Sequence, residues 1–336
     1  MVKIGLVGLG KHMLSQMIPN LLRLPVIITA VCDKDGDKLR QIRRILHLDS
    51  EKCYLSWEQM LEKEALDGVI CVADANLHYM VSKTSLQRGI PVFVEKTPCR
   101  SAAQAAELCR LQKEHHCFGM AGFNRRYTTA YRMMKEVTES EAFGRPCLYL
   151  AKYNSSAYSD SQYFVFNHVI HHLDLMRYLL GEIDSIAAQR IEKADGMTGY
   201  HIRFRSVSGC MGFLQSASLQ CEAYPVERVE ITGDGCCVTA DNVKMLQYNR
   251  PVSAKTEKNP LLGEHDSLCW NYNQGHSSMY GHYGYERELA DFVEAVQAGS
   301  RPENTFDDIC GTMLLYERLL EHCTTVSGGA ETDCKV

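Results

Sequence analysis

The sequence lacks a long apolar run. No stretch approaches the ~18 consecutive apolar residues of a membrane-spanning helix, and Met1-Val2-Lys3 leads straight into a short, glycine-punctuated apolar run. A signal peptide would need a basic start, an apolar core and a cleavage site before that point. The sequence therefore predicts a cytoplasmic protein with no membrane partner.

A surplus of positive charge is missing as well. Lys and Arg together number 36 against 41 Asp and Glu, which gives a net charge of −5. Proteins that hold a nucleic-acid backbone neutralise its phosphates with clustered basic residues. We therefore expect no nucleic-acid partner.

Cysteine is abundant, at 15 residues, but it lacks the spacing that gives cysteine a structural role. The number is odd, the residues are scattered from Cys32 to Cys334, and no Cys-x-x-Cys occurs. A disulfide framework is typical of small secreted chains, and a structural zinc site needs closely spaced ligand pairs. We expect ordinary thiols in a reducing cytoplasm and no metal site.

The length of 336 residues, 45% of them hydrophobic, is enough for about two domains at ~150 residues each. In the first 122 residues, short β-rich apolar runs alternate with amphipathic stretches of helical length, which predicts right-handed crossovers and a parallel sheet. The apolar runs are 3–7, 26–32, 68–73, 90–94 and 118–123, and the helical stretches are near 12–23, 36–46, 76–88 and 101–116. Residues 1–122 are therefore expected to form an α/β domain with a doubly wound parallel sheet.

The pattern changes after Phe123. The remaining segments predict helices near 126–138 and 169–180, and strands near 147–153, 184–194, 198–206, 209–218, 226–232 and onward to about 248. A further helix carries apolar residues at i, i+3, i+4 and i+7, from Leu289 to Val296, and is expected to stop at Gly299. We predict an α+β domain over 123–326, built on a large and mostly antiparallel sheet, and a flexible tail at 327–336.

A dinucleotide site is predicted where the first strand meets the first helix. Gly8 permits a tight turn, and Gly10 lets the backbone approach a pyrophosphate at the helix N-terminus. Met13 stands at the third glycine position, so a plain tight turn is the alternative reading. Asp33 follows the second apolar run, 23 residues after Gly10, where a carboxylate would bind the adenosine ribose. We predict NAD as the cofactor, contacted also by Lys11, His12 and Met13. NADP is the alternative, because Lys34 stands beside Asp33.

Polar motifs follow the later strands of the same predicted sheet, at the edge where such sheets bind ligands. They are Val72-Ala73-Asp74-Ala75-Asn76-Leu77-His78, Val94-Glu95-Lys96-Thr97-Pro98 and Gly122-Phe123-Asn124-Arg125-Arg126-Tyr127, and Asn167-His168-Val169-Ile170-His171-His172-Leu173-Asp174 lies farther on. In this order the motifs resemble the glucose-fructose oxidoreductase, inositol dehydrogenase and MocA (Gfo/Idh/MocA) family over nearly the whole chain. The resemblance implies a Rossmann domain, a second domain with an open sheet, a homodimer or homotetramer assembled through that sheet, and oxidation or reduction of a sugar, cyclitol or related alcohol.

The resemblance also implies the residues of the site. Lys96 matches the family's Glu-Lys-Pro motif, although Thr97 replaces the proline, and His171 matches the histidine of its His-x-x-Asp stretch. Asn167 stands where inositol-dehydrogenase-like members have an aspartate. Further cofactor contacts are expected from Ala73, Asn76, His78, Glu95, Lys96 and Asn124, and substrate contacts from Lys96, Asn124, Arg126, Tyr158, Asn167 and His171.

Hydride transfer from an alcohol needs a base for the hydroxyl proton and a donor that stabilises the developing alkoxide. Histidine titrates near neutral pH, so His171 suits the first role, and the Lys96 ammonium suits the second. We expect Asn167 to contact substrate without transferring protons. The alternatives are a solvated lysine, a hydrogen-bonded core histidine and, for Asn167, a helix cap. His168, His171 and His172 could suggest a metal site, but no second ligand cluster accompanies them.

Aromatic and polar residues alternate in the segment 264–284, which includes Trp270, Tyr272, Tyr280 and Tyr283. Such surfaces stack on sugar C–H faces, so we interpret this segment as a binding or interface loop suited even to a glycoside. The sequence favours an NAD-dependent dehydrogenase that acts on a secondary hydroxyl of a sugar, cyclitol or glycoside. A glycoside-cleaving enzyme that oxidises the ring transiently and a non-catalytic NAD-binding regulator are the alternatives.

Overall fold

The computed structural model describes residues 1–158, 160–193, 195–220, 226–250, 266–272 and 281–326. Its contacts divide the chain into two units, Met1–Tyr127 with Ser277–Leu314 and Thr128–His276 with Leu315–Val336. The first unit thus includes a late segment that the sequence-based division at 122/123 assigns to the second domain. The predicted tail at 327–336 and Tyr280 lie outside the described residues. Within those residues, no helix is long and apolar enough to cross a membrane.

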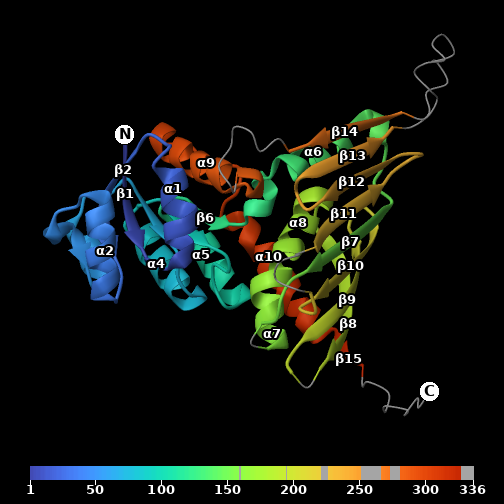
Figure 1. Cartoon of the computed structure of the whole chain (residues 1–336), viewed down its shortest axis with the longest axis horizontal. Helices are drawn as coiled ribbons and strands as arrows, with labels where there is room; N and C mark the ends of the chain where they lie inside the picture. The colour runs from blue at the N-terminus through green and yellow to red at the C-terminus, as the bar shows by residue number, and fades with distance from the viewer. Residues whose placement is uncertain (159, 194, 221–225, 251–265, 273–280, 327–336) are drawn as a thin grey trace, which may run out of the picture. The chain divides into compact units, whose positions relative to one another are not determined.

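The first unit is built on a six-stranded sheet in which every pairing is parallel (Figure 1). Its strand order is β3-β2-β1-β4-β5-β6, the order of a doubly wound dinucleotide-binding sheet. The strands are β1 (Val2–Val7), β2 (Val26–Cys32), β3 (Cys53–Tyr54), β4 (Gly68–Cys71), β5 (Val92–Glu95) and β6 (Gly119–Gly122). The predicted α/β class is therefore confirmed, and the two-residue β3 is the strand that was not predicted.

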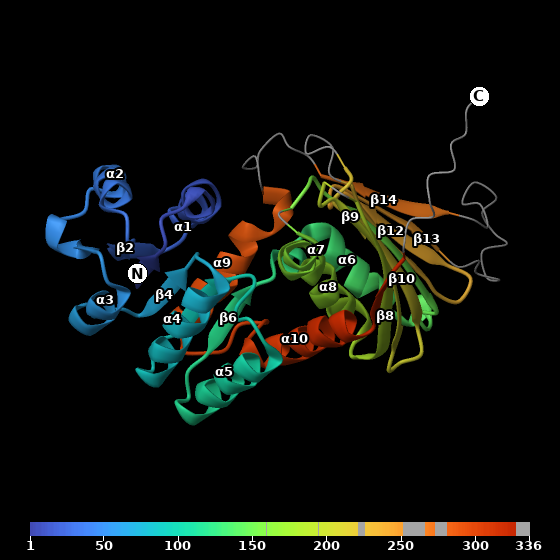
Figure 2. The ribbon, with the colours of Figure 1, turned by 90° about the horizontal axis from the view of Figure 1, so that it is seen from below.

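Helices cover both faces of this sheet. In Figure 2, α1 and α2 lie on one side of the sheet and α3, α4 and α5 lie on the other. The bounds are η1 (Met13–Met17), α1 (Ile18–Leu21), α2 (Gly36–Leu46), η2 (Ser50–Lys52), α3 (Trp57–Lys63), α4 (Ala75–Gln87), α5 (Ala102–Glu114), η3 (Asn124–Tyr127), η7 (Gly281–Tyr283) and α9 (Tyr285–Ala298). Four of these helices begin at a side-chain cap, because Asp35, Ser56, Asp74 and Ser101 each accept a backbone N–H of the first turn.

Helix α9 completes the core of the first unit although it comes late in the chain. Phe292 of α9 packs edge-on against Phe93 and Phe118, with ring centroids 5.9 and 5.8 Å apart. All three rings are buried with the strands they cover. Gly299 ends α9 at a φ of 62°, as the sequence predicts for a helix stop. The core of the first unit thus depends on residues near position 290.

The second unit is built on a nine-stranded sheet in the order β14-β13-β12-β11-β7-β10-β9-β8-β15. The pairings β7–β10 and β8–β15 are parallel and the others are antiparallel, so the predicted mostly antiparallel sheet is confirmed. The strands are β7 (Leu148–Asn154), β8 (Ile183–Glu192), β9 (Thr198–Ser206), β10 (Met211–Ala217), β11 (Val226–Thr232), β12 (Cys237–Asp241), β13 (Met245–Asn249), β14 (Ser267–Asn271) and β15 (Cys323–Thr325). The edge strand β14 falls within the segment interpreted as a binding loop, so that part of the segment extends the sheet.

Helices pack on one face of the nine-stranded sheet, as Figure 2 shows for α6, α7 and α8. They are α6 (Thr129–Thr138), α7 (Ser161–Phe164), η5 (Val165–Val169) and α8 (Ile170–Leu180), with η4 (Glu141–Phe143) after α6 and α10 (Phe306–Glu321) running from the first unit into the second. Along β9, every second residue is buried beneath these helices, while the alternating His201, Arg203 and Arg205 point to the opposite face. That opposite face has no helix over it within the described ranges.

Candidate functional site

The turn after β1, here called the glycine turn (residues 8–10), contains two glycines. The space around their Cα atoms differs. Gly8 has a φ of +82°, and a Cβ added to it would lie 2.1 Å from the carbonyl oxygen of Val72. A Cβ added to Gly10 would meet no atom within 4 Å. The fold therefore requires Gly8, whereas Gly10 leaves open space in front of the first turn of the helix, where backbone N–H groups can bind a phosphate.

This contrast predicts different effects for one substitution at two positions. We expect Gly8→Ala to destabilise the folded protein by several kcal/mol, because the new methyl group clashes with backbone and disfavours the positive φ. Gly10→Ala should leave the melting temperature nearly unchanged while weakening NAD binding by about tenfold. Thermal unfolding and a fluorescence titration with NADH measure the two effects. Equal NADH affinity in Gly10→Ala and wild type would remove Gly10 from the coenzyme site.

Asp33 lies directly against the glycine turn. It follows β2, it is buried, and its Oδ2 accepts the N–H of Leu9 at 2.7 Å while Oδ1 accepts the N–H of Asp35 at 2.9 Å. The Nζ of Lys38 lies 3.8 Å from the same carboxylate. The sequence identified Lys34 as the basic neighbour of Asp33, but Lys38 is the lysine paired with it. The signal for Lys38 was its place one turn into α2, five residues after Asp33.

Cofactor choice should depend on this carboxylate. We expect Asp33→Ala to reduce the preference for NAD over NADP by about tenfold, because the substitution removes like-charge repulsion against a 2′-phosphate. Lys38→Ala should act in the opposite direction and weaken NADP use further. Michaelis constants for both coenzymes in the three proteins test this, and an unchanged NAD preference in Asp33→Ala would contradict it.

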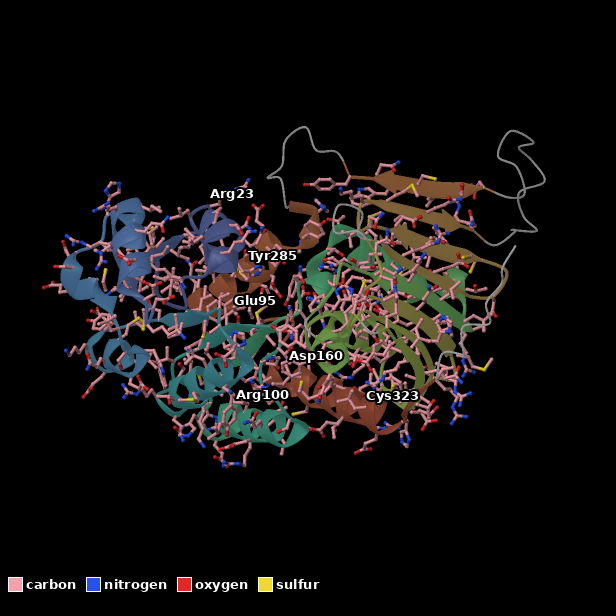
Figure 3. The ribbon with its side chains drawn as sticks, turned by 60° about the horizontal axis from the view of Figure 1, so that its bottom comes forward. Arg23, Glu95, Arg100, Asp160, Tyr285 and Cys323 are labelled. Atoms are coloured by element: carbon pink, nitrogen blue, oxygen red, sulfur yellow. The ribbon has the colours of Figure 1, made fainter. Side chains whose placement is uncertain are left out.

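The three residues after the glycine turn differ in burial and in their contacts. The side chain of Met13 is fully buried in the core, so this position can offer a ligand only its backbone, and Lys11 is exposed. The Nε2 of His12 lies 3.1 Å from Oε1 of Glu95, and the ring of Tyr285 packs edge-on at 5.3 Å. Glu95 and Tyr285, labelled in Figure 3, come from β5 and from the start of α9. The sequence did not pair His12 with Glu95, which are 83 residues apart.

Glu95 and Lys96 end β5 at the carboxyl edge of the sheet. Burial alone raises the pKa of Glu95, but the hydrogen bond and charge of His12 outweigh it and hold that pKa below its usual value. Burial lowers the pKa of Lys96, with Arg125 acting in the same direction and Glu95 against it. The Lys96–Thr97 peptide bond is cis. Lys96 therefore stands as a partly buried ammonium beside a buried carboxylate.

His78 ties together the loops that follow β4 and β5. It is fully buried, its Nε2 accepts the N–H of Ala73 at 2.8 Å, and its Nδ1 lies 3.0 Å from the carbonyl oxygen of Thr97. These partners require the proton on Nδ1, and burial lowers the pKa of the ring. The Oδ1 of Asn76 accepts the Nε–H of Arg100 at 2.6 Å. His78 and Asn76, both predicted to contact the cofactor, thus form hydrogen bonds with the loops that follow β4 and β5.

Asn124 and Arg126 lie on η3 and are buried. The Nδ2 of Asn124 donates to the carbonyl oxygen of Tyr283 at 2.9 Å, and Nη1 of Arg126 lies 3.0 Å from Oδ1 of Asp308. Both partners belong to the late segment of the first unit. These contacts hold the loop after β6 next to the start of α9 and α10.

In the second unit, Asn167 and His171 lie one turn apart in a continuous helical run from Ser161 to Leu180. The cap of this run is Asp160, whose carboxylate accepts the N–H of Tyr163 at 2.7 Å. The helix-cap alternative for Asn167 is therefore wrong. Its Nδ2 donates instead to the carbonyl oxygen of Tyr163 at 3.2 Å, one turn back, and the side chain is partly exposed.

The neighbouring histidines pack around Tyr153 of β7. Its ring stacks on His168 at 3.8 Å and on His172 at 4.2 Å, and it meets His171 edge-on at 6.4 Å. Nε2 of His172 lies 3.4 Å from Oε1 of Glu227. His168 also stacks on Phe164 and lies 5.8 Å from the ring of Tyr158, the other predicted substrate residue in this unit. His168 and His172 thus have structural partners in the core.

Within the described residues, no group of three or more His, Cys, Asp and Glu side chains could hold a metal ion. The first unit combines the glycine turn, Asp33 and Lys96 at the carboxyl edge of one parallel sheet, where such sheets bind dinucleotides. Lys96 belongs to the first unit and His171 to the second. Their pairing therefore remains a prediction.

Comparisons with known proteins agree with this reading of the first unit. Residues 2–123 match the family model GFO_IDH_MocA, described as an oxidoreductase family with an NAD-binding Rossmann fold. The chain is 24% identical over 323 residues to a myo-inositol 2-dehydrogenase of Thermotoga maritima, which covers 91% of this chain and 92% of that protein. It is 29% identical over 201 residues to an inositol 2-dehydrogenase of Acidiphilium cryptum, over 56% of this chain and 57% of that protein.

Two solved structures share the whole fold. A dehydrogenase from Chromobacterium violaceum has a TM-score of 0.85 and 22% identity, covering 95% of this chain and 94% of its own. An oxidoreductase from Agrobacterium radiobacter, solved in complex with NAD+, L-tartaric acid and magnesium, has a TM-score of 0.80 and 18% identity, covering 96% of both chains. At these identities the two structures support the fold of both units.

Proposed function

Residues 2–123 make this chain a member of the Gfo/Idh/MocA family of NAD-binding oxidoreductases, and on that premise we propose that it is a cytoplasmic dehydrogenase. Its substrate is a sugar, cyclitol or glycoside, and the reaction oxidises a secondary hydroxyl. The inositol 2-dehydrogenases among its relatives favour a polyhydroxylated ring. Lys96 and His171 act as the alkoxide-stabilising and proton-transfer pair.

The observation that carries this proposal is the position of Lys96 relative to the glycine turn. Both follow strands of one parallel sheet, and His12, two residues after the turn, contacts Glu95, the residue before Lys96. A coenzyme whose pyrophosphate lies at Gly10 and whose adenosine ribose lies at Asp33 extends along this edge of the sheet. Lys96 then stands beside the nicotinamide end.

The chemistry divides between the two side chains. When bound, NAD supplies the acceptor for the hydride that leaves the carbinol carbon. The Lys96 ammonium donates a hydrogen bond to the substrate oxygen and stabilises the negative charge that develops on it. His171 takes the hydroxyl proton during oxidation and returns it during reduction. Asn124, Arg126, Tyr158 and Asn167 are the proposed substrate-binding side chains.

A substrate screen tests the proposal. Purified protein is mixed with NAD and a panel of sugars, inositols and glycosides, and reduced nicotinamide is followed by its absorbance. We expect NADH to accumulate in proportion to substrate consumed. Glycoside cleavage without net NADH would identify the redox-neutral enzyme, and tight NAD binding without turnover of any compound would identify a regulator.

We also propose that the protein is a homodimer or homotetramer that associates through the uncovered face of the nine-stranded sheet. This face carries large apolar side chains at the surface, among them Leu148, Leu150 and Met211, which are 50%, 53% and 60% exposed. Leu150 and Phe213 are register partners on the paired strands β7 and β10, so they form one contiguous patch. A contiguous apolar patch on a sheet face is typical of an association surface.

A charge on this face should separate the subunits. We expect Leu150→Glu to shift the mass in multi-angle light scattering from the oligomer to the monomer, because an unpaired carboxylate is buried at each copy of the interface. Leu55→Glu is the matched control, since Leu55 is 68% exposed on the first unit. An oligomeric mass for Leu150→Glu would show that subunits do not associate through this face. An equal loss of oligomer in Leu55→Glu would show the same.

A further inference from the structure

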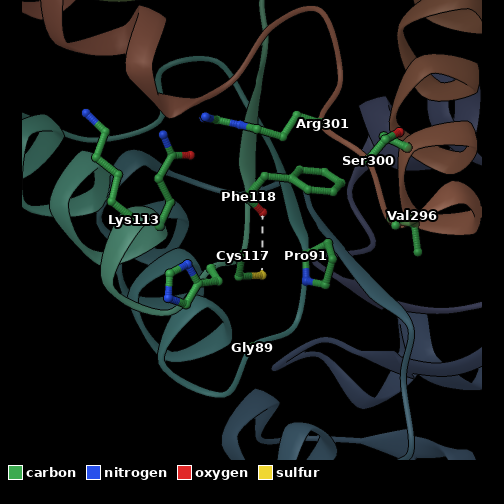
Figure 4. Close-up of a pocket in the computed structure, with 12 residues that line it drawn as sticks. Gly89, Pro91, Lys113, Cys117, Phe118, Val296, Ser300 and Arg301 are labelled. Atoms are coloured by element: carbon green, nitrogen blue, oxygen red, sulfur yellow. Dashed lines mark hydrogen bonds between the residues drawn. The ribbon is translucent and has the colours of Figure 1, made fainter.

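The first unit contains a cavity at the edge of its sheet opposite to the glycine turn. Its volume is about 490 Å³, within the range of small-molecule sites. Pro91 and Phe118 line it, and each lies just before the first residue of β5 or β6, so the cavity sits at the amino ends of these strands. The other walls come from the last turns of α5 and α9 and from the loop after α9 (Figure 4).

One wall of the cavity is apolar. Pro91, Phe118 and Val296 line it, and Phe118 is held in place by edge-on packing against Phe292. A rigid aromatic ring flanked by a proline and a branched aliphatic side chain suits the hydrocarbon or C–H face of a small molecule. None of these side chains belongs to the coenzyme site.

The opposite wall contains a buried amide whose donor end has no partner. Gln112 is 2% exposed, and its Oε1 accepts the N–H of Gly119 at 3.4 Å. Because the Gly119 N–H needs an acceptor, this contact fixes which end of the amide is oxygen. The Nε2 group then has no hydrogen-bond partner among the described residues. Buried amide donors are almost always satisfied, so this one indicates an acceptor supplied from outside the chain.

Two cations line the cavity next to Gln112. Nζ of Lys113 lies 3.0 Å from Oδ1 of Asp307, and Nη2 of Arg301 lies 2.6 Å from Oδ2 of the same carboxylate. The thiol of Cys109 also donates to Asp307 at 3.0 Å. One carboxylate is thus shared by two cations and a thiol. Nη2 of Arg301 also donates to Oγ1 of Thr305 at 3.2 Å. Two cations against one carboxylate leave a surplus positive charge on the rim.

We propose that this cavity binds a small organic anion, with its carboxylate or phosphate group on Gln112, Lys113 and Arg301 and its apolar body on Phe118 and Val296. The site is separate from the coenzyme site, because the strands that begin here end at the opposite edge of the sheet. β5 connects the two edges, since Pro91 precedes it at the cavity and Lys96 follows it at the coenzyme site. The bound anion therefore lies at the amino end of β5, and Lys96 follows the carboxyl end of the same strand.

The test is a calorimetric titration of the full chain with phenylacetate, phenyl phosphate, inorganic phosphate and the neutral phenylacetamide, with and without saturating NAD. We expect phenylacetate or phenyl phosphate to bind at least about tenfold more tightly than phenylacetamide, with an affinity that NAD leaves unchanged. The stronger of the two identifies the preferred acid group. Binding of inorganic phosphate alone, competition by NAD, or no preference for the anions would overturn the proposal.

Variants separate this site from general charge effects. Gln112→Glu keeps the acceptor for Gly119 and replaces the donor end by a carboxylate oxygen, so anion affinity should fall at least about tenfold. Arg301→Gln, at an exposed position, should weaken binding similarly without a risk to folding. Asp307→Asn should tighten binding about threefold, because the cations lose their internal partner. Arg110→Gln is the control. Arg110 lies on α5 like Gln112, but it does not line the cavity, so this variant should bind the anion as the wild type does.

If Gln112 and Asp307 had only structural roles, every folded variant would bind the anion with the same affinity as the wild type. That result would overturn the proposal even if the substrate screen succeeds. Conversely, anion binding at this cavity with no dehydrogenase activity would leave the inference standing and remove the proposed function.

Discussion

Lys96→Met should lower kcat by about a thousandfold or more while leaving the dissociation constant of NADH within about twofold of wild type. The substitution keeps the length of the side chain and removes the ammonium that stabilises the developing alkoxide. Glu95, the buried residue that ends β5 just before Lys96, retains its contact with His12, so the segment after the glycine turn keeps this contact. The loss should therefore appear in the chemical step.

Steady-state kinetics with the best substrate of the screen and a fluorescence titration with NADH measure the two parts of this prediction. Lys63→Met, at an exposed position near the end of α3, controls for loss of a lysine charge in the same unit. If Lys96→Met kept more than a tenth of the wild-type kcat, Lys96 would be a loop residue and the catalytic assignment would be wrong.

His171→Gln should lower kcat at neutral pH by about a hundredfold or more and should change the pH profile. Without a base, turnover depends on hydroxide or water, so log kcat should rise steadily with pH where the wild type levels off. The side chain is buried in α8 and Gln is similar in volume, so the melting temperature should fall only modestly.

His322→Gln is the matched control, because His322 is an exposed histidine of the second unit outside the helical run that carries His171. We expect its kcat and pH profile to equal those of wild type. An unaltered pH profile in His171→Gln, with kcat reduced in proportion to folded protein, would assign His171 to packing around Tyr153 rather than to proton transfer.

The sequence was sufficient for the elements whose pattern is local. β2, α2, β9 and β11 have the predicted bounds because each is a complete run of one hydrophobic period with a turn signal at its end. β3 has two residues, too few for any period, and its partner strand is set by tertiary packing. α10 (Phe306–Glu321) was not predicted from the sequence.

For the candidate site too, positions set by local pattern were predicted and contacts between distant residues were not. Gly8, Asp33 and Lys96 were predicted to lie at one edge because each follows a predicted strand of a parallel sheet, and their positions in the structure agree. The side-chain contacts between distant segments were not predicted. His12 with Glu95, Asn124 with Tyr283 and Arg126 with Asp308 join residues between 83 and 182 positions apart. Asn167 was misread as a possible cap because Asp160, the true cap, starts the helix a full two turns earlier than its apolar pattern indicates.

The packing of α9 against the first sheet has a consequence for synthesis of the protein. When the first 127 residues have been translated, every strand of the parallel sheet has been synthesised, yet Phe93 and Phe118 still lack their packing partner Phe292. This apolar surface stays uncovered while more than 150 further residues are translated. We therefore expect the nascent chain to be prone to aggregation until α9 has been translated and covers this surface.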